Sequence, residues 1–275
     1  MKHVLCKSLL AAVLITAGGC RGGDADKKAV PPEPKGEPAT SGANAAAETP
    51  AADPPAENSA AKLEKLGVRL ERDYQGVVRE AVAVGLKITD AELKHLSGLR
   101  ELESLEIGNC PITDAGLARL DGLTSLQTLY LHDVPVTDAG LAHLQGLTQL
   151  TVLTMQNTEI TGTGLIHLKP LADLEVLNLS RNPVGDDALK NIEGLAKLNT
   201  LGLENTEVTD AGLIHFKTLT KLRVLNLNGC AITDPGLTNL PGLSELRMLH
   251  VKDTKVTKDA VKKLRKKMKG LAVYY

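Results

Sequence analysis

The chain has 275 residues, and its 32 lysine and arginine residues nearly balance its 33 aspartate and glutamate residues, giving a formal net charge of −1. This weakly acidic balance lacks the basic footprint of a nucleic-acid-binding protein, so we expect no nucleic acid among the partners. The length is enough for one or two domains, but the composition of the first sixty residues sets them apart from the rest.

Residues 1–19 have the composition of an export signal. Lys2 and Lys7 supply positive charge, and residues 9–17 are apolar except for Thr16. About ten apolar residues are half of the roughly 20 that a helix needs to cross a bilayer, so we expect no permanent transmembrane span. The sequence Ala-Gly-Gly-Cys that ends at Cys20 resembles the bacterial lipobox, in which the cysteine is lipidated and becomes the new N-terminus. The alternative is an ordinary secretory signal with an unmodified Cys20.

The lipobox resemblance implies an exported lipoprotein of the cell envelope, held at a membrane through lipid on Cys20. Arg21 stands where an Asp favours inner-membrane retention in well-studied Gram-negative bacteria. The resemblance therefore favours the outer membrane or its periplasmic face over the inner membrane.

Residues 20–62 have the composition of a disordered tether. Seven of the 13 prolines lie in this segment, and residues 21–62 include no Leu, Ile, Phe or Tyr. Such a segment buries too little apolar surface to offset the entropy lost on ordering. We expect a flexible spacer between the lipid anchor and a folded head.

A repeat of 24 residues without insertions fills residues 89–256 in seven full copies. The copies begin at Thr89, Thr113, Thr137, Thr161, Gly185, Thr209 and Thr233. Within each copy, apolar residues spaced by two predict a strand, and those spaced by three predict a short helical segment. A Thr-Asp pair at the helical start is able to cap it, and Thr89 with Glu92 has the spacing of a capping box. Recurrent glycines predict C-terminal caps at 98, 122, 146, 194 and 242.

The exposed ends of a stack of repeats need caps. We expect an N-terminal cap at residues 63–88, with a degenerate strand at 77–84. A C-terminal cap is expected at 257–275, with a helix that opens at Thr257 and a closing strand at 271–275. Seven basic residues lie between Lys258 and Lys269, against the single acidic residue Asp259. A solvated capping face is the favoured interpretation, and a patch for a membrane or an anionic partner is the alternative.

The repeats follow the pattern L-x-x-L-x-L-x-x-(N, C or T)-x-(L or I). It is matched by Leu102, Leu105, Ile107, Cys110 and Ile112 and by Leu174, Leu177, Leu179, Asn182 and Val184. The sequence resembles the leucine-rich-repeat family, most closely the cysteine-containing subtype. The resemblance implies an α/β horseshoe solenoid with a continuous parallel sheet and short convex helices. No segment resembles the F-box that accompanies this subtype in ubiquitin ligases, so the ligase function is not carried over.

Cys110 and Cys230 occupy the same position of the pattern, five repeats apart. At ~4.8 Å for each strand they would be roughly 24 Å apart, whereas a disulfide needs Cα atoms within ~7 Å. We therefore expect both cysteines to fill the turn after a strand without pairing.

The sequence offers little for catalysis or metal binding. His95, His143, His167 and His215 share one convex position, whereas a metal needs ligands that converge from different directions. No H-E-x-x-H, G-x-S-x-G or C-x-x-C motif is present in the sequence, and a solenoid without insertions offers a shallow surface. We expect no enzyme, no cofactor and no metal.

The outward residues of the strands vary between copies, as a binding surface would. They form two columns: 106, 130, 154, 178, 202, 226 and 250, and 108, 132, 156, 180, 204, 228 and 252. We predict a non-catalytic, membrane-tethered module that binds a protein or peptide on this concave face. The predicted site residues are Tyr130, His132, Gln156, Asn178, Glu204, Asn226, Asn228, His250 and Lys252. The alternatives are a structural envelope protein without a specific ligand and a recognition subunit resembling F-box-associated repeats.

Overall fold

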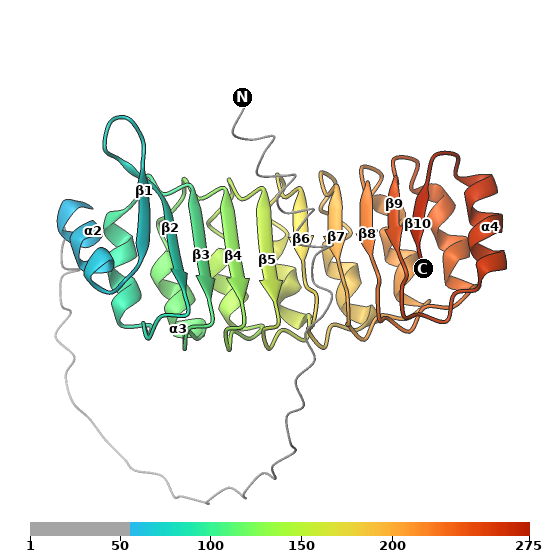
Figure 1. Ribbon diagram of the computed structural model, residues 1–275, viewed down its shortest axis with the longest axis horizontal. Helices are drawn as coiled ribbons and strands as arrows, with labels where there is room; N and C mark the ends of the chain where they lie inside the picture. The colour runs from blue at the N-terminus through green and yellow to red at the C-terminus, as the bar shows by residue number, and fades with distance from the viewer. Residues whose placement is uncertain (1–55) are drawn as a thin grey trace, which may run out of the picture.

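A computed structural model describes residues 56–275 as one elongated solenoid (Figure 1). The strands lie side by side in a sheet on one long face, and the helical segments cover the opposite face. Ten strands form this sheet within the described residues, and their spatial order follows the chain from β1 to β10. The repeats therefore stack in sequence order, and the leucine-rich-repeat solenoid predicted from the sequence is confirmed.

Seven strands belong to the repeats, and they pair in parallel at intervals of 24 residues, as Leu105 does with Leu129. They are β3 (Ser104–Gly108), β4 (Thr128–His132), β5 (Val152–Gln156), β6 (Val176–Asn178), β7 (Thr200–Gly202), β8 (Val224–Asn226) and β9 (Met248–His250). The closing strand β10 (Ala272–Tyr274) continues the parallel sheet from β9.

The sheet is not wholly parallel, because its first strand runs the other way. β1 (Arg69–Arg72) pairs antiparallel with β2 (Val78–Val84), and β2 then pairs in parallel with β3. The connection between β1 and β2 is too short for a crossover, so the chain returns as a hairpin. The Asp73 side chain holds the turn by accepting the backbone N–H groups of Gln75 and Val77.

The N-terminal cap begins earlier than predicted. Helix α2 (Ala56–Lys65) includes the end of the segment assigned to the disordered tether, so the boundary at residue 62 is wrong. Ser59, Ala60 and Leu63 are buried on its inner side, where Ala60 and Leu63 join the core of the repeats. The small Ala60 side chain contributed no pattern to the sequence, yet it is buried against the core. The signal and Cys20 lie outside the described residues.

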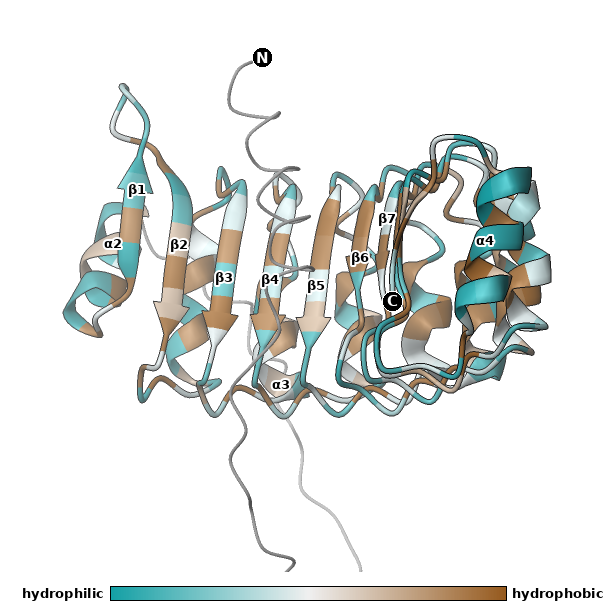
Figure 2. Ribbon diagram, turned by 45° about the vertical axis from the view of Figure 1, so that its right-hand side comes forward, coloured by the Kyte–Doolittle hydropathy of each residue, from teal (hydrophilic) through white to brown (hydrophobic). Residues whose placement is uncertain are grey.

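The helical face consists mostly of short 3₁₀ helices of three to seven residues. It is formed by η1 (Glu92–Gly98), α3 (Asp114–Leu117), η2 (Ala118–Leu120), η3 (Gly140–Leu144), η4 (Thr163–Leu168), η5 (Asp186–Ile192), η6 (Gly212–Thr218), η7 (Gly236–Gly242) and the terminal helix α4 (Lys258–Lys267), where η denotes a 3₁₀ helix. One continuous leucine-rich core runs between this face and the sheet, and Figure 2 shows hydrophobic residues recurring in every layer.

The predicted glycine caps are largely wrong. Among these glycines only Gly122 has a left-handed backbone, with φ of +89°, and Gly98 and Gly242 are the last residues of their 3₁₀ helices, without a left-handed cap. A 3₁₀ helix closes with short-range bonds, such as that from the Leu99 N–H to the Leu96 carbonyl, and needs no left-handed residue. Most left-handed positions of the repeats instead follow the strands, at Asn109, Asp133, Asn157, Arg181, Asn205, Gly229 and Asp253, and Gly162 at the start of η4 is a further exception.

The two cysteines have the structural role predicted for them. Both are free and buried, and the Cys230 thiol lies 2.9 Å from the Leu203 carbonyl oxygen. Asn182 occupies the same position in its own repeat, where its amide donates to the carbonyls of Met155 and Leu179. This column therefore satisfies carbonyl groups in the turns between repeats.

Candidate protein-binding face

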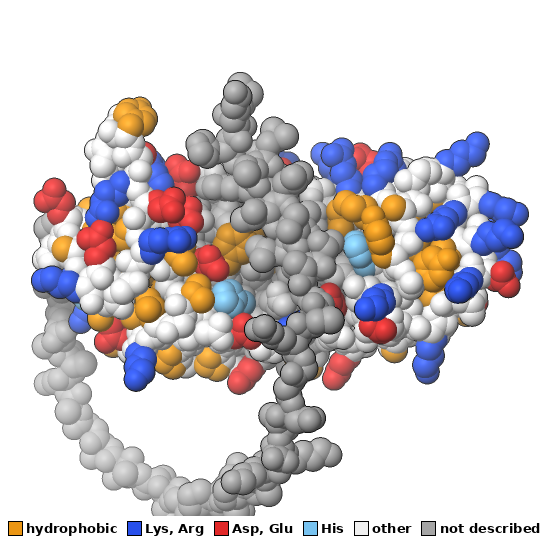
Figure 3. Space-filling view, viewed as in Figure 1, with side chains coloured by type: hydrophobic (Ala, Val, Ile, Leu, Met, Phe, Trp, Pro, Cys, Tyr) orange, Lys and Arg blue, Asp and Glu red, His pale blue; other side chains and the backbone are white. Residues whose placement is uncertain are grey.

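The outward side of the sheet presents three columns of side chains, not the two that the sequence indicated. The missed column contains Ser104, Thr128, Val152, Val176, Thr200, Val224 and Met248. These residues begin the strands and alternate with the inward leucines, so the period of two could have identified them. Figure 3 shows part of this face, with charged side chains of both signs around β1 and β2.

A recess of about 430 Å³ lies on the N-terminal half of this face. It brings together four of the predicted residues, Tyr130, His132, Gln156 and Asn178. Arg69 and Glu80 of the cap hairpin complete one side of the recess. They could not be predicted from the repeat, because the cap does not follow it. Its remaining lining residues are Ser104, Glu106, Thr128, Asp133 and Thr154.

Tyr130 forms the aromatic wall of the recess. Its ring packs against Val152 and Val176 in a small apolar cluster that is separate from the main core. Burial raises the pKa of the Tyr130 phenol, and the nearby carboxylates of Glu106 and Glu80 raise it further. The phenol therefore stays protonated at neutral pH and offers a hydroxyl donor beside an apolar surface.

His132 forms the polar wall. Its ring lies over Gly108, where a Cβ atom would come within 2.0 Å of the imidazole. Its Nδ1 lies 3.0 Å from an Asp133 carboxylate oxygen, and its Nε2 lies 3.5 Å from Glu106 Oε1. The Asn157 amide donates to Asp133 over 2.6 Å. Burial alone would raise the pKa of Asp133, but the bonds from Asn157 and His132 hold it below its usual value.

Two of the predicted site residues, Asn178 and Asn226, are buried. The Asn178 Oδ1 accepts the backbone N–H of Ser180, and the Asn226 Oδ1 accepts that of Asn228, each over 3.0 Å. These amides therefore hold the ends of their own strands. Their contribution to a binding surface is to its shape more than to direct contact.

The other predicted residues lie on β7 to β9 or just after these strands, away from the recess. Glu204 accepts a hydrogen bond from the Asn226 amide over 3.1 Å, and the Lys252 backbone N–H donates to the Asn228 side chain over 2.8 Å. His250 stacks on Tyr274 with ring centroids 4.6 Å apart, and burial lowers the pKa of His250. The structure thus separates the predicted residues into a group at the recess and a group towards the C-terminal end.

The convex histidines do not converge. His215 Nδ1 lies 2.6 Å from a Glu193 carboxylate oxygen, and His143 lies 3.8 Å from Asp121. Within residues 56–275 no group of three or more His, Cys, Asp or Glu side chains is placed to hold a metal ion. In the same residues, no helix has both the length and the apolar character to cross a membrane.

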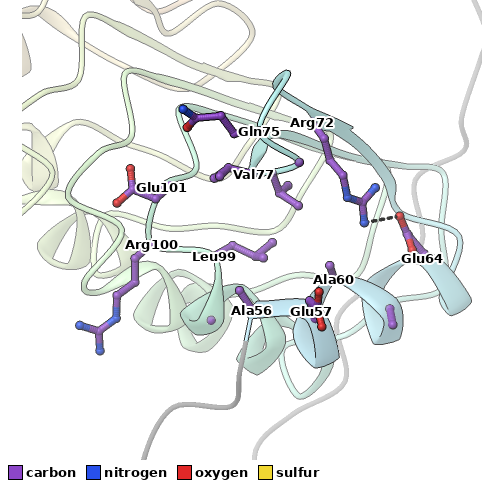
Figure 4. A pocket seen from close by; sticks show the side chains of 14 residues that line it. Ala56, Glu57, Ala60, Glu64, Arg72, Gln75, Val77, Leu99, Arg100 and Glu101 are labelled. Atoms are coloured by element: carbon purple, nitrogen blue, oxygen red, sulfur yellow. Dashed lines mark ion pairs between the residues drawn. The ribbon is translucent and has the colours of Figure 1, made fainter.

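A second hollow, of about 390 Å³, lies at the N-terminal cap between α2, the turn of the β1–β2 hairpin and the end of η1 (Figure 4). Arg72 and Glu64 form an ion pair of 2.8 Å across it. Figure 4 shows the short side chains of Ala56 and Ala60 beneath this pair, whereas the Arg100 side chain points away. The hollow is therefore a gap between cap elements, bordered by a structural ion pair.

Comparison with known proteins identifies the repeat. Residues 99–120, 172–192 and 218–240 match the family model described as a leucine-rich repeat. No curated protein sequence matches the chain. Internalin C2 from Listeria monocytogenes is 21% identical, with a TM-score of 0.57 over 82% of this chain and 99% of its own.

Two plant receptors share the fold. The ectodomain of the Arabidopsis receptor kinase HAESA, solved with a peptide hormone, is 18% identical, with a TM-score of 0.60 over 79% of this chain and 40% of its own. The plant peptide hormone receptor RGFR1, solved with RGF2, is 16% identical, with a TM-score of 0.53 over 75% and 36%. This chain thus spans less than half of each receptor chain. At such identities the likeness shows a common fold.

Proposed function

We propose that this chain, a member of the leucine-rich-repeat family, binds a protein or peptide on the outward face of its sheet, centred on the recess beside Tyr130. The observation that carries the proposal is the recess itself. The recess places the aromatic side chain of Tyr130 beside the hydrogen-bonding side chains of His132 and Asp133. A large aromatic residue beside hydrogen-bonding groups is the composition of a protein-binding hot spot.

The contrast between the two sides of each strand supports the same conclusion. Inward positions hold leucine or a similar residue in every repeat, because they fill one core. The outward positions differ between repeats, from Glu106 to Tyr130 to Thr154 in one column. A shallow face of this kind suits recognition of an extended partner, and the proposed function is accordingly non-catalytic. The peptide hormones in the two receptor structures support a peptide as one class of partner.

We further propose that the protein is exported and held at the cell envelope by lipid on Cys20. The Ala-Gly-Gly-Cys sequence after a short apolar stretch supports this location. Three saturated chains on one cysteine would make the attachment effectively permanent, because each buried CH₂ contributes ~0.8 kcal/mol. The sheet face would then meet partners in the envelope or beyond it. A structural envelope protein without a ligand is the second candidate.

Site-specific photocross-linking in the native envelope tests the proposal. A photoreactive residue at Gln156 lies in the recess, and the same residue at Lys169 lies exposed on the helical side as a control. We expect Gln156 to give adducts of defined mass that Lys169 does not give. Identical adducts from both positions, or none from Gln156, would favour the structural role.

A further inference from the structure

The C-terminal end of the solenoid carries a concentrated positive charge that the binding face does not explain. Helix α4 and Lys269, two residues beyond its end, present a basic end face, which we define as Lys258, Lys262, Lys263, Arg265, Lys266, Lys267 and Lys269. All seven are exposed, and none takes part in an ion pair that the structure of residues 56–275 records. Figure 3 shows lysine and arginine gathered at this end, and Figure 2 shows the hydrophilic outer side of α4.

Folding alone does not account for this charge. The inner side of α4 packs through Val261, Leu264 and Met268, and any polar outer side would cap the core equally well. Lys258 with Lys262, and Lys262 with Lys266, are like charges four residues apart, which destabilise a helix. Basic residues favour the last turn of a helix, but Lys258 stands at the first position, where the helix dipole opposes it.

An aromatic side chain lies beside the basic end face. Tyr275 is about half exposed. The Arg265 guanidinium lies 5.9 Å from the centre of the Tyr275 ring, and an open hollow between α4 and Tyr275 is lined by Lys258, Lys262 and Lys266. Lysine side chains with tyrosine at their margin are the combination that settles at the headgroup level of a bilayer.

We propose that the basic end face binds the anionic phospholipid headgroups of a membrane surface. Lysine acts as a flexible point charge, whereas shaped phosphate recognition in a phosphopeptide or nucleic acid relies on the arginine fork. Arg265 is the only arginine of this face, and its guanidinium already donates to the Val273 carbonyl over 2.9 Å. An array of lysines on one exposed helix therefore suits a diffuse, flat, anionic surface. This inference concerns a different part of the molecule from the recess and does not require lipid on Cys20.

Vesicle co-sedimentation tests the inference on the full chain carrying Cys20→Ala, which cannot be acylated. The probes are vesicles of phosphatidylcholine and vesicles that also contain phosphatidylglycerol. The N-terminal apolar stretch contributes to both, so the preference for the anionic vesicles is the readout. We expect the chain to bind the anionic vesicles more tightly than the neutral ones. The triple variant Lys258→Gln, Lys262→Gln and Lys266→Gln should reduce this preference about 100-fold, because each lysine lost should weaken binding roughly fivefold.

The matched control removes three exposed lysines elsewhere, through Lys169→Gln, Lys217→Gln and Lys221→Gln, and should retain the preference. Glutamine has a helix propensity close to that of lysine, so α4 should persist in the first variant. A salt titration of the protein with its basic end face intact gives a second measurement, because screening of the charges at ~0.5 M salt should abolish the preference for anionic vesicles. The inference is overturned if the anionic vesicles are not preferred, if salt has no effect, or if the control loses as much as the α4 variant.

Discussion

Asp114 joins its repeat to the next one through Thr137. One carboxylate oxygen of Asp114 accepts the Thr137 backbone N–H over 2.8 Å, and the other accepts the Thr137 hydroxyl over 2.6 Å. The same pairing joins Asp90 to Thr113, Asp138 to Thr161, Asp186 to Thr209, Asp210 to Thr233 and Asp234 to Thr257. The Thr-Asp pair of the sequence therefore connects neighbouring repeats, in addition to the local capping that was expected of it.

Replacing Asp114 should weaken the stack. Asp114→Ala leaves the Thr137 N–H and hydroxyl without their acceptor in a partly buried setting, which should lower the free energy of unfolding by about 1–3 kcal/mol. Asp121→Ala is the matched control, because that side chain is 66% exposed and should change stability by under ~0.5 kcal/mol. Urea unfolding of both variants makes the comparison. Equal losses would show that the pairing between repeats contributes little.

The ladder of pairs has one gap, and three positions change together there. Gly162 replaces the Asp, Gly185 replaces the Thr that would pair with it, and Ala188 replaces the Gly of the next repeat. Elsewhere that glycine leaves room for the preceding Asp, since a Cβ at Gly140 would come within 2.3 Å of Asp114 Oδ1. At the gap no carboxylate is present, and Ala188 fills the space instead.

Restoring the Asp alone, without its Thr partner and the Gly of the next repeat, should lower the free energy of unfolding. A Cβ at Gly162 would meet the Ala188 Cβ at 2.2 Å, and the φ of +108° at Gly162 strains an L side chain, so Gly162→Asp should cost more than the ~1–3 kcal/mol of overpacking alone. Adding Ala188→Gly and Gly185→Thr removes the clash and supplies the partner, and the triple variant should recover part of the loss. A cycle of urea unfolding measurements gives the coupling free energy. If the effects of the three substitutions on the free energy of unfolding simply added up, the proposed dependence between these positions would be contradicted.

His250 should make stability depend on pH. Burial lowers the pKa of His250 below its ordinary value of about 6.5, so the unfolded chain binds the proton more readily than the folded protein does. Stability is therefore fully present above the unfolded pKa and is lost as pH falls towards the folded pKa. Unfolding in urea at about pH 7.5 and 5.5 should show this loss.

His250→Phe is the control for the pH effect, because phenylalanine can keep the stacking on Tyr274 without titrating. The loss between the two pH values should be smaller in this variant. Part should remain, since burial also lowers the pKa of His95. If the parent and the variant lost the same stability between the two pH values, His250 would be excluded as a source of the pH dependence.

Cys20→Ala tests the proposed anchor. The variant should leave the membrane fraction or accumulate as an uncleaved precursor, because the acceptor of the lipid is gone. Fractionation in high-salt buffer makes the result independent of charge attraction at α4. Processing followed by the same membrane association as the parent would show that Cys20 is not the anchor.

Most of the fold could be predicted from the sequence because the same pattern of apolar residues recurs in seven copies. The inward leucines fixed the strands, and the spacing of Cys110 and Cys230 excluded a disulfide between them. The N-terminal cap was predicted at residues 63–88 with a strand at 77–84, where β2 lies, but the start of α2 and the strand β1 were not predicted, because both elements occur once and use small or charged residues. The links from Asp to Thr escaped because they join residues 23 positions apart, a distance that only the stacking of repeats makes short.

The candidate site was predicted only in part. The varied columns placed Tyr130 and His132 on the outer face of the sheet, where the structure has them. The period of two does not show, however, how deeply an outward side chain is buried. Asn178 and Asn226 looked like available amides, although both are buried and hold backbone N–H groups. Arg69 and Glu80 reach the recess from a hairpin outside the repeat, so no pattern within the repeat includes them.

The most direct test of binding at the recess compares two double variants of the full chain in its native envelope. Tyr130→Ala with His132→Ala removes the aromatic and polar walls, and His143→Ala with His167→Ala changes the helical side. Loss of a buried aromatic anchor can cost ~2 kcal/mol or more of binding free energy, so the first variant should lose its cross-linked partners. Neither pair belongs to the leucine core, so both variants should stay folded. Retained partners in the recess variant, with loss in the helical-side variant, would contradict the account.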